Sequence, residues 1–119
     1  MPGRQFLCKC GVRQGDPLSP LIFVLAAELL QAAVNEVFRQ GRIHLPFPCR
    51  GQTDYPALQY ADDTLIVLPA CIHQATLIKH ILSDYASSIG LKINFHKSTL
   101  IPINLDLEAT NNLARVFGC

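Results

Sequence analysis

Two adjacent carboxylates, Asp62 and Asp63, are the residues of this chain best suited to chemistry. They fall between two short apolar segments, so the sequence predicts a β-hairpin with acids at its tip. Carboxylate oxygens held close together suit hard divalent cations such as Mg²⁺, and two-metal phosphoryl transfer needs such an arrangement. Neighbouring side chains on a strand point to opposite faces, so the turn must redirect one of the two, and Asp62 is expected to be the principal ligand. An ordinary solvated turn is the alternative interpretation of the pair alone.

The segment from Gly11 to Pro20 is a second candidate site. Its two glycines let backbone approach a ligand closely, and a helix is expected to begin directly after them. Ser19 before Pro20 is a typical helix start, because serine caps free amides and proline tolerates the first helical position. The segment therefore predicts either a place for an anionic or sugar-bearing ligand or a capped turn that enters a core helix.

Taken together, these segments resemble a known family. The stretch from Gly11 to Phe23 closely resembles motif B of reverse transcriptases, and Tyr60-Ala61-Asp62-Asp63 resembles motif C. Gly90 to Ser98 is similar to the motif D region of non-LTR (LINE-type) retrotransposons. The resemblance extends from about Arg4 to Leu100 and identifies residues 1–119 as a partial reverse transcriptase palm domain.

The resemblance implies RNA-directed DNA synthesis on a right-hand palm, with Mg²⁺ or Mn²⁺ as the cofactor. Asp62 and Asp63 match the metal-binding aspartates of motif C. Tyr60 would then lie beside the primer terminus, and Ala61 would line the same site. An RNA template, a DNA primer and a deoxynucleoside triphosphate are the implied partners.

The same resemblance assigns roles outside the hairpin. Gln14 and Gly15 match motif B positions that contact the incoming nucleotide and the template. Arg13 could meet phosphate through its planar guanidinium, or it could be a surface cation. Lys97 stands where motif D places a lysine proposed to assist the departure of pyrophosphate; a solvated surface lysine is the alternative.

Motif A of the family has no counterpart in this sequence. It is a strand with another catalytic aspartate that lies N-terminal to motif B, and nothing before Gly11 matches it. Asp16 belongs to motif B and Asp84 lies on a predicted helix, so neither is a natural substitute. Two-metal chemistry takes its ligands from separate strands, and the chain alone is therefore expected to be inactive.

Three hypotheses follow for the role of the chain. It could be a truncated reverse transcriptase, such as a retroelement remnant, for which a partner chain would supply motif A and the fingers. It could be a non-catalytic interaction or nucleic-acid-binding module that pairs through an uncovered apolar face. It could also be a marginal fragment with no selected function and an unpaired sheet edge.

The expected fold class is α+β, a partial polymerase palm with antiparallel hairpins packed against two long helices. Hydrophobic periodicity and turn residues predict the individual elements. These are a strand at Gln5–Cys10, a helix at Pro20–Arg39, a loop at Leu45–Pro56, strands at Ala57–Tyr60 and Thr64–Leu68, a helix at Ile72–Ile89 that stops at Gly90, strands at Leu91–Phe95 and Thr99–Ile103, and a last helix at Leu107–Phe117.

Composition sets broad limits on the function. A chain of 119 residues that is 50% hydrophobic and 16% charged fits one folded domain. The net charge of +1 gives no global basic field, so a nucleic-acid contact would depend on local Lys and Arg. His73 and His80 are seven residues apart and could share a helix face, but no role is assigned to them.

The cysteines and the apolar runs bear on location. The five cysteines are odd in number and scattered, so we expect reduced thiols and an intracellular setting, with nucleus or cytoplasm left open. The longest apolar run, Leu21 to Ala27, is far shorter than the ~20 residues that span a bilayer, so no membrane segment is expected. The cysteines are Cys8, Cys10, Cys49, Cys71 and Cys119.

Overall fold

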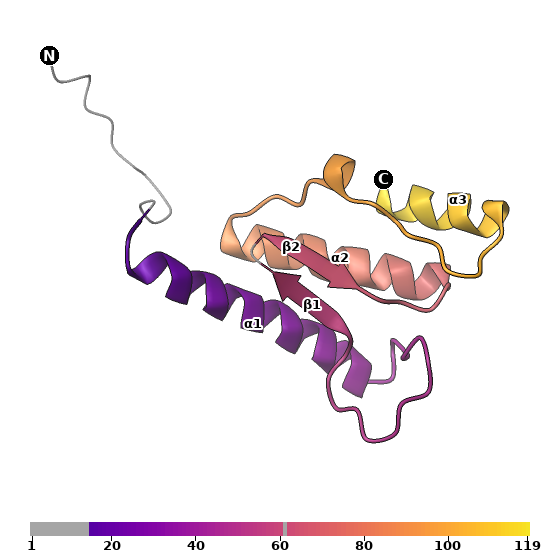
Figure 1. The fold of residues 1–119 in the computed structure, drawn as a ribbon, viewed down its shortest axis with the longest axis horizontal. Helices are drawn as coiled ribbons and strands as arrows, with labels where there is room; N and C mark the ends of the chain where they lie inside the picture. Colours follow the sequence, from indigo (N-terminus) through magenta and orange to yellow (C-terminus); the bar gives the residue numbers. More distant parts are fainter. Residues whose placement is uncertain (1–14, 61) are drawn as a thin grey trace, which may run out of the picture.

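The computed structural model describes residues 15–60 and 62–119, and Figure 1 shows how their elements are arranged. The described part consists of helices and one two-stranded antiparallel sheet, β1 beside β2. The predicted α+β class is therefore confirmed. The elements in chain order are α1 Leu18–Arg39, β1 Ala57–Tyr60, β2 Asp63–Ile66, α2 Ile72–Ile89, a 3-10 turn at Phe95–Lys97 and α3 Leu107–Phe117.

Helix α1 begins two residues earlier than predicted, and Asp16 binds its first turn. The Asp16 carboxylate accepts a hydrogen bond from the backbone N–H of Leu18 at 2.9 Å, and the Asp16 carbonyl accepts one from Ser19 N–H at 3.1 Å. Asp16 therefore satisfies free amides of the first turn. The helix ends at Arg39 as predicted, and Gly41 follows it with φ +69°, a conformation that favours glycine.

The hydrophobic core forms around the C-terminal half of α1. Leu30, Val34 and Val37 of this helix pack with residues of the next segment and of α2. Tyr55 belongs to the stretch predicted as an irregular loop, yet it is only 2% exposed. Its hydroxyl donates to the His44 carbonyl at 2.9 Å, which explains why a polar group can be buried there. The other buried residues of this core are Ile43 and Ile78.

Helices α2 and α3 complete the fold. Helix α2 buries Ala75, Ile78 and Ala86 and stops at Gly90, which has φ +75° in the left-handed region, as predicted. Helix α3 lies beside α2 (Figure 1), and the Lys79 ammonium donates to the Val116 carbonyl at 2.7 Å. The predicted bounds of these two helices are confirmed.

The predicted strand pair at residues 91–95 and 99–103 is wrong. The chain there is irregular except for the 3-10 turn at Phe95–Lys97. The Asn94 side chain accepts from Lys97 N–H at 3.2 Å, and the Asn94 carbonyl accepts from the Ser98 hydroxyl at 3.0 Å, so local bonds replace a strand ladder. Ile101 and Ile103 are each 72% exposed, so their alternation meets no layer that would bury one face. The strand predicted at residues 5–10 lies outside the described residues.

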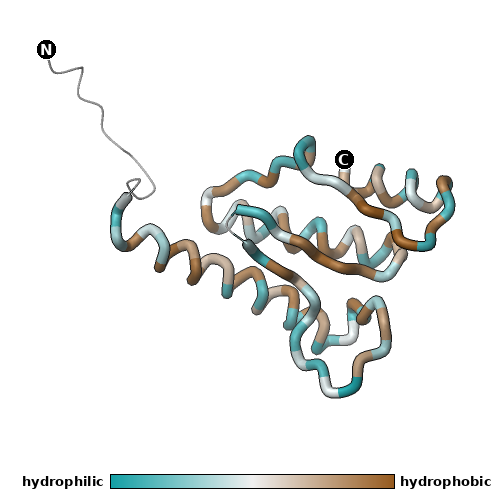
Figure 2. The backbone as a smooth tube through the Cα atoms, in the orientation of Figure 1, coloured by the Kyte–Doolittle hydropathy of each residue, from teal (hydrophilic) through white to brown (hydrophobic). Residues whose placement is uncertain are grey.

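Helix α1 also bears on the membrane prediction. Among the residues that the structure describes, it is long and apolar enough to cross a membrane by length and composition, although core helices of soluble proteins pass the same test. Figure 2 shows apolar residues along the N-terminal half of α1, which extends beyond the other elements. The expectation that no segment spans a membrane stays a prediction. Cys49, Cys71 and Cys119 carry free thiols, as expected, whereas Cys8 and Cys10 lie outside the described residues.

Candidate active site

The hairpin of β1 and β2 carries the two aspartates. Tyr60 pairs with Asp63, so the connection between the strands is only two residues long. Asp62 lies in this connection and Asp63 is the first residue of β2; both are exposed. The predicted hairpin is confirmed, but its second strand starts one residue earlier and ends two residues sooner than Thr64–Leu68. Ala61 lies outside the described residues.

The strand register decides which face each residue occupies. Directly opposed residues of an antiparallel pair share a face, and alternate residues along a strand return to it. Tyr60 and Asp63 therefore lie on one face together with the pair Leu58 and Leu65. That face is open, since Tyr60 is 85% exposed and the two leucines are 67% and 52% exposed. The site is thus a shallow, exposed surface on the described part of the chain.

The other face of the hairpin is fastened to α1. The Gln59 side-chain amide donates to the Ala27 carbonyl at 3.1 Å. From α2, the Tyr85 hydroxyl donates to the adjacent carbonyl of Ala26 at 2.6 Å, and partial burial raises the pKa of this tyrosine. Sequence reasoning missed both contacts. Gln59 is a polar residue at an inward-facing strand position between Leu58 and Tyr60, and this could have indicated a hydrogen bond to a neighbouring element.

A second set of polar contacts fixes the start of β1 on the same helix. The Asn35 side-chain oxygen accepts from Tyr55 N–H at 2.8 Å and from the Gln31 amide at 2.9 Å. The Gln31 amide also donates to the Tyr55 carbonyl at 3.1 Å. Burial raises the pKa of Tyr55 to about 12, because the charged phenolate would lose its hydration. These hydrogen bonds fix where the hairpin lies along the axis of α1, and therefore where its tip lies.

Motif B is described only in part. Gly15 has φ +81°, which a glycine adopts without strain, and a Cβ added there would meet no atom within 4 Å. It directly precedes Asp16 and the first turn of α1. Arg13 and Gln14, the other predicted contacts of nucleotide and template, lie outside the described residues.

Lys97 is not brought to the aspartates by the described contacts. It is exposed in the 3-10 turn that follows α2. Its neighbour Phe95 lies 5.2 Å, from ring centre to nitrogen, from the Lys79 ammonium in the middle of α2. No contact within residues 15–60 and 62–119 joins Lys97 to Asp62 or Asp63. Its predicted role therefore rests on the sequence resemblance.

The donor set on the hairpin fits a divalent cation in kind. Asp62 and Asp63 offer the oxygen ligands that Mg²⁺ prefers, and proteins often bind Mg²⁺ through one or two carboxylates together with substrate phosphates. Within the described ranges, no group of three or more His, Cys, Asp or Glu side chains is arranged to hold a metal ion. The two aspartates are therefore an incomplete ligand set on this part of the chain.

Comparison with known proteins supports the family that the sequence resembles. Residues 2–107 match the family model described as reverse transcriptase (RNA-dependent DNA polymerase). A curated relative, the uncharacterized mitochondrial protein AtMg01250 of Arabidopsis thaliana, is 39% identical over 54 residues, which are 45% of this chain and 44% of the relative. The chain thus matches less than half the length of that relative. No solved structure matches it. Because the family model covers most of the sequence, this chain belongs to the reverse transcriptase (RNA-dependent DNA polymerase) family.

Proposed function

We propose that this chain is a fragment of an RNA-directed DNA polymerase palm of the LINE type, in which Asp62 and Asp63 hold the divalent cations. The supporting observation is the hairpin itself. Tyr60 and Asp63 oppose each other on its exposed face, while Gln59 on its other face binds α1, the helix that follows the motif B glycine Gly15. Motifs B and C, 45 residues apart at Gly15 and Tyr60, are joined through this helix.

In this proposal each described residue has a distinct task. Mg²⁺ or Mn²⁺ would supply charge stabilisation for the transferring phosphoryl group. Asp62 and Asp63 provide oxygen ligands, and the exposed Tyr60 ring offers a surface for the primer end. Gly15 leaves open space where a template or nucleotide can approach the backbone. Lys97 keeps the role that the sequence resemblance implies, assistance to the departure of pyrophosphate, although no described contact joins it to the hairpin.

The isolated chain is proposed to be inactive, because no third carboxylate joins the hairpin aspartates in the described residues. A primer-extension assay on an RNA template with Mg²⁺ or Mn²⁺ tests this. We expect no DNA synthesis by the chain alone. Robust synthesis that Asp62→Asn abolishes, and that Asp84→Asn on the exposed face of α2 leaves intact, would show that the inactivity proposal is wrong.

Metal binding can be tested without activity. Mn²⁺ broadens the NMR signals of nuclei near its binding site, so titration of the labelled chain should broaden the amides around Asp62 and Asp63 first. Asp62→Asn and Asp63→Asn should each weaken this effect, whereas Asp84→Asn should leave it unchanged. Uniform broadening at all exposed carboxylates would contradict a hairpin metal site.

A second candidate function is an interaction module that pairs with another chain. The N-terminal half of α1 exposes six large apolar side chains, each between 46% and 65% exposed. Fully burying an exposed side chain of this size contributes about 1.5 to 3 kcal/mol, so covering these half-exposed ones contributes roughly half as much each, and a partner that covers several would bind with considerable affinity. We propose that the partner is a segment that carries motif A and the fingers. The six residues are Leu18, Leu21, Ile22, Phe23, Val24 and Leu25.

Light scattering after size-exclusion chromatography tests whether the N-terminal half of α1 drives self-association. We expect the chain alone to self-associate as its concentration rises, and the double variant Leu21→Gln, Leu25→Gln to remain monomeric. The matched control Ile101→Gln, Ile103→Gln removes two apolar side chains elsewhere that are somewhat more exposed, and this variant should still self-associate. A chain that is monomeric at every concentration would count against an obligate partner on α1.

A further inference from the structure

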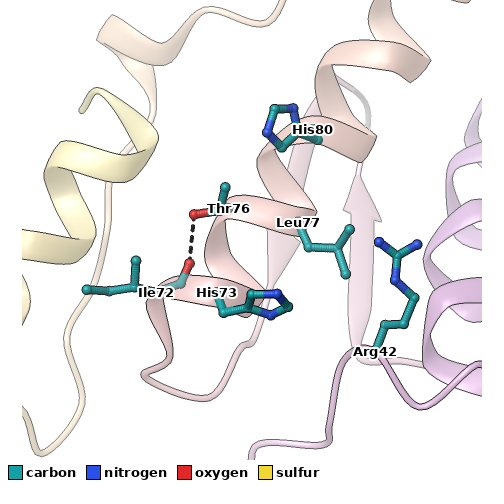
Figure 3. A pocket seen from close by; sticks show the side chains of 6 residues that line it. All are labelled: Arg42, Ile72, His73, Thr76, Leu77 and His80. Carbon is teal, nitrogen blue, oxygen red and sulfur yellow. Dashed lines mark hydrogen bonds between the residues drawn. The ribbon is translucent and has the colours of Figure 1, made fainter.

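An open groove lies at the other end of the fold from the candidate active site. It has a volume of about 610 Å³ and is formed by Arg42, which follows α1, and by the first turns of α2 (Figure 3). The hairpin tip points the other way: β1 starts after Tyr55, beside Asn35, and by Gln59 it has reached Ala27. Figure 1 shows the C-terminal end of α1 and the start of α2 at the same end of the molecule. The lining residues are Arg42, Ile72, His73, Thr76, Leu77 and His80.

The groove has three basic side chains with no partner in the described residues, and a Thr76 hydroxyl that donates to the Ile72 carbonyl at 2.8 Å. Arg42, His73 and His80 line it, and no acidic side chain does. Within the described part of the chain, none of these three side chains makes a hydrogen bond or an ion pair. Arg39 is a useful contrast, since its guanidinium is held by Glu36 at 2.6 Å. The Arg42 guanidinium keeps its five N–H donors available, and each imidazole ring adds at least one N–H donor.

The spacing of these donors fits an extended anion better than a single ion. His73 and His80 are seven residues apart on α2, which places them on one face about 10.5 Å apart along the axis. Leu77 lies between them, and Figure 3 shows the Arg42 side chain extending toward it. Donors separated by two helical turns cannot share one metal ion or one phosphate, but they can contact successive phosphates of a polymer. Leu77 is the apolar residue between the two histidines, whereas Ile72 extends from the opposite side of α2 (Figure 3).

We propose that this groove binds the backbone of a single-stranded nucleic acid, at a site separate from the Asp62 and Asp63 hairpin. Arg42 supplies the charge, and the two histidines add hydrogen bonds along the strand. A single strand is proposed because its flexible backbone can follow a short groove with a cation, without base-specific contacts. The choice of nucleic acid as the polymer rests on the proposed polymerase function. The groove and its donors are features of the structure and are independent of that function.

Fluorescence anisotropy with a labelled twelve-nucleotide single strand tests the proposal on the full chain. The assay is run in EDTA, so metal binding at the hairpin plays no part. A hydrogen bond to a charged group is worth about 1.5 to 3 kcal/mol, so Arg42→Gln should weaken binding roughly tenfold or more. It should also lower the dependence of affinity on salt by about one unit of log–log slope. His73→Asn with His80→Asn should weaken binding less.

Arg39→Gln is the matched control. It removes the same charge three residues before Arg42, but the Arg39 guanidinium is already paired with Glu36. It should change the affinity by less than about twofold. Equal losses for Arg42→Gln and Arg39→Gln, or no binding of single-stranded RNA or DNA by the intact chain, would overturn the proposal. Tighter binding of a duplex than of either single strand would overturn the choice of ligand. The Mn²⁺ titration does not involve Arg42. Loss of nucleic-acid binding in the groove and loss of metal binding at the hairpin are therefore detected by different measurements.

Discussion

The two halves of α1 have similar apolar content but different surroundings. In the C-terminal half, Leu30, Val34 and Val37 are buried against Tyr55 and the facing side of α2. In the N-terminal half, Leu21 and Leu25 are more than half exposed, although their neighbours in sequence are equally apolar. Figure 2 shows apolar residues in both halves. One helix therefore has a half that is packed and a half that is still uncovered.

This difference indicates what the helix is suited to. A helix that is apolar on most sides is normally surrounded by other elements, whereas a surface helix keeps a polar face. The bonds from Gln59 and Tyr85 reach α1 at Ala27 and Ala26, the boundary between the two halves. Beyond that boundary Phe23 and Val24 border a groove beside Ala57 and Gln59 of β1, but no described residue buries a side chain of the helix there. The N-terminal half thus has the composition of a buried helix and fits the proposal that further polymerase structure packs there.

The largest expected effect is on stability, and it differs between the halves. Leu30→Ala removes a side chain that is 3% exposed and should lower the free energy of unfolding by about 2 to 5 kcal/mol. Leu25→Ala makes the same change at a position that is 65% exposed and should cost less than about 0.5 kcal/mol. Urea denaturation of both variants measures the difference. Similar losses would mean that the N-terminal half is packed in solution and that the comparison is wrong.

A smaller effect concerns the pH dependence of the packed half. The pKa of Tyr55 is about 12 in the folded chain against about 10 in an unfolded one, so folding favours the neutral phenol. The neutral Tyr55 phenol therefore contributes to the free energy of unfolding. This contribution is fully present below about pH 10 and is lost as the pH rises from 10 to 12. Tyr55→Phe should lower stability at pH 7 by about 1 kcal/mol, since the bond to the His44 carbonyl is lost.

The same variant should also flatten the decline in stability between pH 10 and 12, which chemical denaturation at several pH values would reveal. The difference between wild type and variant isolates Tyr55 from the lysines that titrate in the same range. Parallel curves for the two proteins would contradict a buried, neutral phenol at this position.

Two predicted hairpins show how far the sequence determines this fold. At residues 57–66 the alternation of inward and outward side chains is supported by a two-residue turn and by Gln59, which binds α1, and the hairpin forms. At residues 91–103 the alternation is equally regular, but Asn94 binds its neighbours and no layer covers Ile101 or Ile103. Local patterns predicted α1, α2, α3 and the position of the aspartates, because each depends on neighbours in sequence.

Contacts between distant residues could not be predicted in this way. Tyr85 and Ala26 are 59 positions apart, and Gln59 and Ala27 are 32 apart, so no local pattern relates them. The burial of Tyr55 is of the same kind, since a tyrosine in a proline-containing loop looks exposed until Asn35 and His44 are seen to bind it. The open groove beside Arg42 depends equally on how α1 and α2 meet.

The smallest expected effect is at the first turn of α1, where the uncovered half begins. Asp16→Ala removes the carboxylate that accepts from Leu18 N–H, a change that costs about 0.5 to 2 kcal/mol when a helix end is coupled to the core. Here the first turn is remote from Leu30 and Val34, so global stability should change by no more than the low end of that range. Amide hydrogen exchange should instead speed up locally over residues 18–22 while the amides around Val34 stay protected, because opening of the first turn need not disturb the packed half. If exchange accelerated equally at both ends, the helix would open as one cooperative unit, and the two halves would not be energetically separate.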